Sequence, residues 1–282
     1  MQHVVKAIVL DIDGVIIGGK QGVNCPYPHP DVIAKLKEAQ ARGIPVALCT
    51  ARLGATLANN FPGLDGPHIT DNGSLILTSS GSVLKKYPFE KENAKAIVKL
   101  MLENGYYTEV YAPREHYIQK GQKCEFTEGI AKFQFKHPKE VDSLLDICGN
   151  EEVIKIMTTV ANVGMMAALD VLQKSVERCA DFAWAFTPSS PYRFAQATAK
   201  GVSKSQGIRD LAELLGVPLE NMLGVGDSVA DWKFIELCGY GAAMGNSGED
   251  FKELVRSKGG ANGYVGGHVD ENGLMGILEH FL

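Results

Sequence analysis

The chain has 282 residues, which at about 100 to 200 residues per domain allows one large domain or two ordinary ones. Its composition, 45% hydrophobic and 22% charged, is that of a folded globular protein and excludes disorder as the main state. With 28 Lys and Arg against 33 Asp and Glu, the formal net charge is −5, so no basic excess is available to neutralise nucleic-acid phosphates or anionic lipid. We therefore expect neither nucleic acid nor a membrane as a partner.

Targeting and cysteine patterns point to the cytoplasm. No stretch reaches the ~18 consecutive apolar residues of a membrane span, and the first residues lack the features of a signal peptide. The six cysteines include no Cys-x-x-Cys pair, so they fit neither a disulfide framework nor a structural zinc site. We expect a cytoplasmic protein whose thiols are reduced and mostly buried.

The first fifty residues predict a strand, a helix and a second strand. The apolar run from Val4 to Leu10 suits a strand covered on both faces, and Ile44 to Cys49 forms the second strand. Between them, Asp31 is typical of a helix N-cap and Gly43 of a helix end. The residues expected on the inner face of this helix are Ile33, Leu36 and Ala39. This βαβ order predicts neighbouring parallel strands.

The C-terminal part repeats this alternation. We expect a helix capped by Ser203 and running to Leu215, a strand over 222–225, a helix over about 229–237 and a strand over 241–244. Both ends of the chain therefore predict one α/β core, a doubly wound parallel sheet.

The middle of the chain predicts an α+β domain, with helices on one face of its sheet and the other face exposed. The clearest element is a helix over 90–104 that buries one apolar face, and alternating residues predict a strand over 130–135. The other expected elements are strands at 106–111, 152–159 and 182–186 and helices starting at Pro138 and Gly164.

Turn-rich stretches at 71–81 and 187–191 border this middle part and predict two hinge-like linkers. We therefore expect a core domain made of residues 1–76 and 191–282, with a second domain, 77–190, inserted between its two parts.

Carboxylates follow two strands of the predicted core. Asp11 and Asp13 come directly after the first strand, at the end where open α/β sheets bind ligands, and two such carboxylates need a shared cation or proton. Asp227 and Asp231 follow a later strand and could hold Mg²⁺ through oxygen ligands. For each motif alone, a turn or a helix cap is an open alternative.

Two further polar residues meet the same sheet edge. Thr50 ends the second strand, where its hydroxyl and the following N–H groups suit an anion, although a helix N-cap is an alternative. Lys204 begins a helix, where a cation opposes the helix dipole, so helix stability does not explain it, and a surface lysine is the alternative.

Together these segments resemble the haloacid dehalogenase (HAD) superfamily of phosphohydrolases. Asp11-Ile12-Asp13-Gly14-Val15, Thr50, Lys204 and the segment 226–231 are similar to its four motifs in order and spacing. Segments 71–74, 202–204 and 243–246 are similar to the Cof-type branch, subfamily IIB, whose inserted α/β domain is called the cap.

The resemblance implies a mechanism. Asp11 would attack the phosphorus of a monoester and form an aspartyl-phosphate, while Asp13 would protonate the leaving oxygen and then activate water. Mg²⁺ would be held by Asp11, the backbone carbonyl of Asp13, and Asp227, and Asp231 would orient a metal-bound water.

The resemblance also implies roles for the residues at the other matching motif positions. Thr50, the Ala51 N–H and Lys204 would bind the phosphoryl oxygens. At position 230 the branch commonly has Asn, and Ala230 cannot replace its amide. The residues with possible contacts to the substrate or around the metal ligands are Arg52, Asn72, Ser228 and Asn246.

We therefore expect a Mg²⁺-dependent phosphatase that acts on a small phosphorylated metabolite, with a sugar phosphate as first choice, and that is a monomer or a homodimer. A phosphosugar mutase of the same superfamily and a non-catalytic phosphometabolite-binding module are the alternatives.

Overall fold

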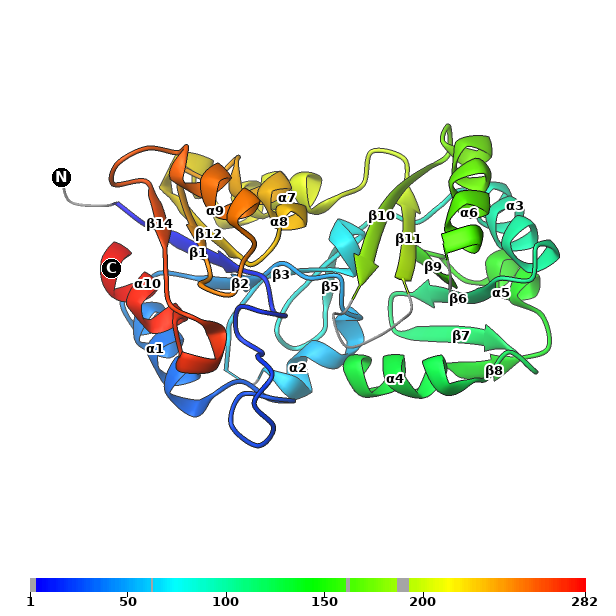
Figure 1. Ribbon diagram of the computed structural model, residues 1–282, viewed down its shortest axis with the longest axis horizontal. Coiled ribbons are helices and arrows are strands. Elements are labelled where there is room, and N and C mark those ends of the chain that lie inside the picture. The colour runs from blue at the N-terminus through cyan, green and yellow to red at the C-terminus, as the bar shows by residue number, and fades with distance from the viewer. Residues whose placement is uncertain (1–3, 62, 161–162, 187–192) are drawn as a thin grey trace. The chain divides into compact units, whose positions relative to one another are not determined.

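The computed structural model describes residues 4–61, 63–160, 163–186 and 193–282 (Figure 1). Contacts divide the chain into two compact units. The first unit comprises Met1–Ala51, Leu57–Leu84 and Lys204–Leu282, and the second comprises Arg52–Thr56 and Lys85–Ser203. Both boundaries lie later in the chain than those expected from the turn-rich stretches. The second one does so because residues 193–199 pair with strands of the second unit.

The described residues of the first unit form a five-stranded parallel sheet in the order β14-β13-β12-β1-β2. β1 is an inner strand of this sheet and pairs with β12 on one side and with the edge strand β2 on the other, with Leu10 opposite Val225 and Leu48. The bounds are β1 Ala7–Leu10, β2 Val46–Leu48, β12 Met222–Gly226, β13 Tyr240–Ala243 and β14 Gly263–Val265. The predicted α/β fold with a parallel sheet is confirmed.

Helices cover both faces of this sheet (Figure 1). Because side chains alternate along a strand, Ile8 and Leu10 pack in one apolar cluster with α1 and α10, while Ala7 and Val9 pack in another with α7, α8 and α9. The helices are α1 Pro30–Ala41, α2 Leu57–Asn60, α7 Lys204–Leu215, α8 Val229–Ile235, α9 Glu249–Arg256 and α10 Leu274–Phe281.

Two sequence-based expectations about the first unit are wrong in detail. The N-cap of α1 is His29, whose Nδ1 accepts from the backbone N–H of Asp31, and Val32 is fully buried where Ile33 is only partly so. The stretch expected as a linker at 71–81 holds a strand, because its apolar residues pair in a small sheet, β3-β4-β5. The bounds are β3 His68–Thr70, β4 Leu75–Leu77 and β5 Val83–Lys86.

The second unit contains a six-stranded sheet in the order β10-β11-β9-β6-β7-β8, antiparallel except for the pair β7-β8. Its strands are β6 Tyr107–Ala112, β7 Glu115–Gln119, β8 Lys139–Val141, β9 Lys155–Val160, β10 Ala180–Phe186 and β11 Arg193–Ala199. Its helices are α3 Lys91–Glu103, α4 Glu125–Gln134, α5 Leu144–Asn150 and α6 Val163–Val176. Val110 and Ile156 pack with α3, α5 and α6 on one face.

Two elements of the second unit differ from the sequence-based expectation. Residues 130–135, predicted as a strand, belong to α4 up to Gln134, because Phe126, Ile130 and Gln134 lie four residues apart on one buried helical face. No helix starts at Pro138. β8 comes first, and α5 begins after Ser143, whose Oγ accepts from the Asp146 N–H.

The second face of this sheet, expected to be exposed, carries buried polar side chains. Glu109 accepts hydrogen bonds of 2.5 Å from the hydroxyls of Tyr107 and Tyr111, and the Lys155 ammonium lies 4.0 Å from the centre of the Tyr111 ring. Phe126 of α4 packs edge-on against Tyr107, so α4 covers part of this face. The predicted linker at 187–191 lies outside the described residues.

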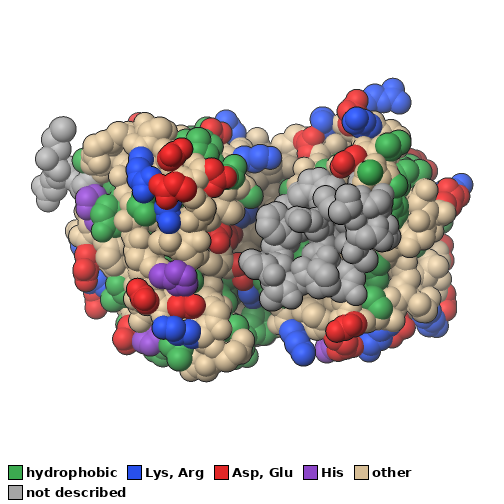
Figure 2. Space-filling model, viewed as in Figure 1, with side chains coloured by type: hydrophobic (Ala, Val, Ile, Leu, Met, Phe, Trp, Pro, Cys, Tyr) green, Lys and Arg blue, Asp and Glu red, His purple; other side chains and the backbone are tan. Residues whose placement is uncertain are grey.

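The helices, the surface charges and the cysteines can be compared with what the composition predicts. Within the described ranges, no helix has both the length and the apolar character needed to cross a bilayer. Figure 2 shows acidic and basic side chains interspersed over the described residues of the face in view. All six cysteines are free, and Cys49, Cys148 and Cys238 are buried, so half of the thiols are buried where most were expected to be.

Leu36→Ala tests the packing of α1 on the sheet. Leu36 is fully buried, so its truncation should lower the free energy of unfolding by about 2 to 5 kcal/mol. Leu214→Ala, the same change at a helix position that is 41% exposed, should cost less than ~1 kcal/mol. Urea unfolding followed by circular dichroism measures both, and equal losses would contradict the assigned core.

Candidate active site

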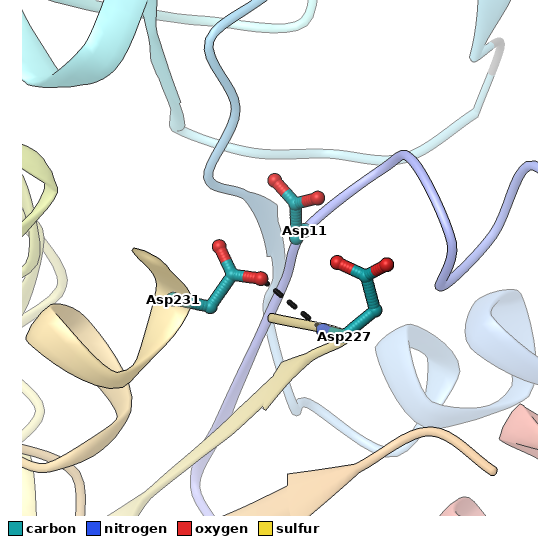
Figure 3. Close-up of side chains that lie close together, drawn as sticks. All are labelled: Asp11, Asp227 and Asp231. Carbon is teal, nitrogen blue, oxygen red and sulfur yellow. Dashed lines mark hydrogen bonds between the residues drawn. The ribbon is translucent and has the colours of Figure 1, made fainter. Parts of the chain in front are cut away.

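Three carboxylates meet at the carboxyl edge of the parallel sheet (Figure 3). Asp11 directly follows β1, Asp227 directly follows β12, and Asp231 lies in the first turn of α8. Because β1 and β12 are paired in parallel, their last residues end side by side. One oxygen of each carboxylate lies within 4.8 Å of the others, so the structure gathers three acidic groups at one point.

Lys204 links two of these carboxylates. Its Nζ lies 2.7 Å from Asp11 Oδ1 and 2.7 Å from Asp231 Oδ1. All three side chains are nearly buried, with Lys204 and Asp11 each 11% exposed and Asp231 2% exposed. These two ion pairs explain why a lysine occupies the first residue of α7 although the helix dipole disfavours a cation there.

The other oxygen of Asp231 organises the loop after β12. Oδ2 accepts from the backbone N–H groups of Asp227 at 3.1 Å and Ser228 at 3.3 Å, and from the Ser228 hydroxyl at 3.2 Å. Ser228 is the N-cap of α8 and forms a capping box with Asp231. Both carboxylate oxygens of Asp231 are therefore engaged by protein groups.

Position 14, beside Asp227, accommodates only a glycine. Its φ of +77° lies in the left-handed region, and a Cβ placed on it would lie 2.1 Å from Asp227 Oδ2. Gly226 meets a similar limit, since its Cβ would lie 2.5 Å from the Cβ of Asp231. Both glycines let the backbone approach the carboxylates closely.

The clustering shifts the proton affinities of these groups. Burial raises the pKa of Asp11 well above its usual value, against the lowering effect of Lys204, and the nearby carboxylates add to the rise. Burial lowers the pKa of Lys204, but Asp11 and Asp231 outweigh it and hold the pKa well above the usual range. Burial and the Asp231 charge raise the pKa of Asp227 to about 7.

The remaining predicted residues are placed as follows. Thr50 is buried after β2; its backbone N–H donates to Ile69 O and its carbonyl accepts from the Asn72 N–H, so its backbone is held by β3 and by the turn that follows β3. Ala51 is half-buried, and Ala230 is exposed in the first turn of α8. Asp13 is half-buried and forms an isolated β-bridge with Ile17.

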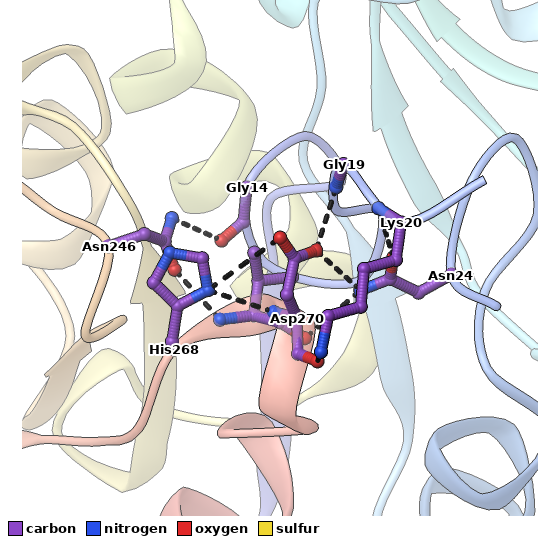
Figure 4. Close-up of polar contacts among 8 residues, drawn as sticks. Gly14, Gly19, Lys20, Asn24, Asn246, His268 and Asp270 are labelled. Atoms are coloured by element: carbon purple, nitrogen blue, oxygen red, sulfur yellow. Dashed lines mark hydrogen bonds and ion pairs between the residues drawn. The ribbon is translucent and has the colours of Figure 1, made fainter.

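Arg52 belongs to the second unit, where its guanidinium lies 4.2 Å from the centre of the Phe133 ring. Asn246 lies in the first unit and bonds to Gly14 O at 2.9 Å (Figure 4).

Asp270 was not expected from the sequence; its Oδ1 accepts hydrogen bonds from the Gly19 N–H and from Asn24 Nδ2 in the loop after β1. These partners are about 250 residues apart, so no local pattern indicates the contact.

A doubly wound parallel sheet with three carboxylates and a buried lysine at its carboxyl edge defines an α/β protein whose candidate site lies at the edge where open sheets of this kind bind ligands. The chain belongs to the haloacid dehalogenase-like hydrolases, whose family model matches residues 8–275. The expected HAD superfamily is confirmed, as is an enzyme of the HAD phosphatase type.

Individual relatives agree with this assignment. Phosphatase YwpJ of Bacillus subtilis (strain 168) is 24% identical over 299 residues and covers 98% of this chain and 100% of its own length. The 5-amino-6-(5-phospho-D-ribitylamino)uracil phosphatase YcsE of the same organism is 26% identical over 282 residues, which are 99% of this chain and 96% of the relative. A solved HAD subclass IIB sugar phosphatase aligns with a TM-score of 0.79 at 24% identity, over 98% of this chain and 99% of that one.

Asp227→Asn tests the electrostatic strain in the cluster. The pKa of Asp227 is about 7 in the folded protein and about 3.9 in an unfolded chain, so the folded protein binds this proton more tightly. The stability that the bound proton gives the folded protein is lost as the pH rises through 7. Removing the charge should raise the Tm of the protein in EDTA at pH 8 and raise it less at pH 5. Asp65→Asn, at an exposed position, is the control. A rise of equal size at both pH values would contradict the assignment.

Proposed function

We propose that this hydrolase is a Mg²⁺-dependent phosphatase that releases phosphate from a small phosphorylated metabolite, with a sugar phosphate as the first candidate. The observation that carries the proposal is the buried Lys204 bridge between Asp11 and Asp231, directly beside Asp227. The phosphatase names of the relatives support it, and they include a ribitylaminouracil phosphate and a sugar phosphate as substrates.

Asp11 is the proposed nucleophile. Its carboxylate oxygen forms a bond to phosphorus while the bond from phosphorus to the leaving oxygen breaks, which gives an aspartyl-phosphate. The Lys204 ammonium, 2.7 Å from Asp11 Oδ1, favours the ionised carboxylate and offers N–H donors to an incoming phosphoryl oxygen. Asp13 gives a proton to the leaving oxygen, and then takes one from the water that hydrolyses the intermediate.

The donor set fits Mg²⁺. Carboxylate oxygens are the ligands this ion prefers, and three of them converge within 4.8 Å. We assign Asp11, Asp227 and the backbone carbonyl of Asp13 as ligands. Asp231 is assigned to a supporting position, because Lys204 and the α8 N-terminus already engage both of its oxygens. When bound, the cation neutralises charge between the carboxylates and the phosphate.

Phosphate release tests the proposal. Wild type is incubated with p-nitrophenyl phosphate and a panel of sugar, nucleotide and cofactor phosphates, with Mg²⁺ or with EDTA. We expect Mg²⁺-dependent release, and a loss on the order of 10⁴-fold or more in Asp11→Asn, because the amide is no longer a nucleophile. Asp65→Asn, an exposed change of the same kind, should keep wild-type turnover.

The products decide between the alternatives. Free phosphate with the dephosphorylated alcohol supports the phosphatase, whereas an isomeric phosphosugar indicates a mutase and binding without turnover indicates a binding module. Near wild-type turnover by Asp11→Asn would rule out its role as nucleophile.

Mg²⁺ binding should depend on pH. Because a proton and the cation compete for Asp227, whose pKa is about 7, a fixed Mg²⁺ concentration should raise the Tm less at pH 6 than at pH 8. Thermal unfolding with and without Mg²⁺ measures the difference. In Asp227→Asn the Mg²⁺-induced rise should be small at both pH values, and an undiminished rise in that variant would contradict Asp227 as a ligand.

A further inference from the structure

The loop after β1, residues 12–25, is fastened by two side chains from the C-terminal part of the first unit (Figure 4). Within itself the loop is held by backbone hydrogen bonds from Gly14 N to Ile17 O at 2.8 Å and from Gly18 N to Asn24 O at 3.0 Å. The two fastening residues are Asn246, after β13, and Asp270, after β14.

Asn246 joins three segments through one amide. Its Nδ2 donates to Gly14 O at 2.9 Å, and its Oδ1 accepts from the Val269 N–H at 3.0 Å. The loops after β1, β13 and β14 therefore meet at this side chain. Both ends of the amide are used, so no smaller or singly polar side chain reproduces both bonds.

Asp270 fastens the outer part of the same loop. Its Oδ1 accepts from Gly19 N at 2.7 Å and from Asn24 Nδ2 at 3.1 Å, and its carbonyl accepts from Lys20 Nζ at 2.8 Å. Asn24 Nδ2 also donates to Val269 O at 3.1 Å. The bonds from Asp270 to the loop do not include the Asn246 side chain, and the bond to Gly14 comes from Asn246.

The bond to Gly14 matters because Gly14 follows Asp13. The Gly14 backbone lies against Asp227, with the Cβ position only 2.1 Å from Asp227 Oδ2, so this peptide can shift little without disturbing the carboxylate. Fixing the Gly14 carbonyl fixes the end of the turn that carries Asp13. Asp11 has a different anchor, since Lys204 holds its carboxylate directly.

We propose that Asn246 is a positioning residue: through the Gly14 carbonyl it holds Asp13 where the carboxyl can give its proton to the leaving oxygen. This inference rests on the proposed function. In the step concerned, Asp11 forms its bond to phosphorus, the bond to the leaving oxygen breaks, and the proton moves from Asp13 to that oxygen. An alkoxide needs this proton, whereas p-nitrophenolate leaves readily without it.

The test compares leaving groups in Asn246→Asp. This change keeps an acceptor for the Val269 N–H but turns a carboxylate oxygen toward the Gly14 carbonyl, where the two repel. We expect kcat/KM for the best alkyl phosphate of the panel to fall about 10- to 100-fold, a part of the 10² to 10⁴ that acid catalysis contributes, and kcat/KM for p-nitrophenyl phosphate to fall less than about 3-fold. Asn262→Asp, the same change at an exposed asparagine, should alter neither value.

A purely structural role gives a different pattern. If kcat/KM falls by the same factor for both substrates, or for neither, the inference is wrong. Asn246→Ala, which removes both bonds without adding charge, is the second variant should Asn246→Asp fail to fold, and the same unequal loss is expected of it. Wild type that hydrolyses neither substrate would instead overturn the proposed function itself.

Discussion

The structure of the site depends on one buried cation placed between two buried carboxylates. Removing Lys204, Asp11 and Asp231 from water is costly, and their mutual attraction offsets that cost only with short, well-directed contacts. The two distances of 2.7 Å meet this condition. Asp227 forms no ion pair of this kind with Lys204, and burial together with the charge of Asp231 raises its pKa to about 7. A divalent cation beside Asp227 would offset both effects, which supports the proposed metal-dependent reaction.

Strand pairing and helix starts place these four side chains at one edge of the sheet. Parallel pairing of β1 with β12 brings the segments after both strands to one edge, and the first residues of α7 and α8 bring Lys204 and Asp231 to the same edge. Close packing there leaves no room for a Cβ at Gly14 or Gly226. The chemistry of the edge is thus built into strand order and into two positions where a side chain cannot be accommodated.

The sequence predicts an element well where its complete pattern lies within one segment. The apolar face expected for the helix over 90–104 is the buried face of α3, and its members Ala94, Ile97, Val98 and Met101 all lie within that one helix. The prediction failed at 130–135, where the helical face of α4 begins at Phe126, before the window that suggested alternation. Motif order indicated that Asp11, Asp227, Asp231 and Lys204 share one sheet edge, while their individual roles stay predictions. The Asn246 to Gly14 bond spans 232 positions and has no local sequence pattern.

The position of β1 has a consequence for synthesis of the chain. β1 is made before the other strands of its sheet, yet one of its two neighbours, β12, begins only at Met222, after the whole second unit. Until then one edge of β1 has no partner, and an unpaired apolar strand edge can pair with other chains. Lys204 is made shortly before β12, so the lysine and the missing neighbour of β1 become available at nearly the same stage of synthesis. The nascent chain therefore carries an unpaired edge of β1 and an incomplete carboxylate cluster until residues 204–231 have been made.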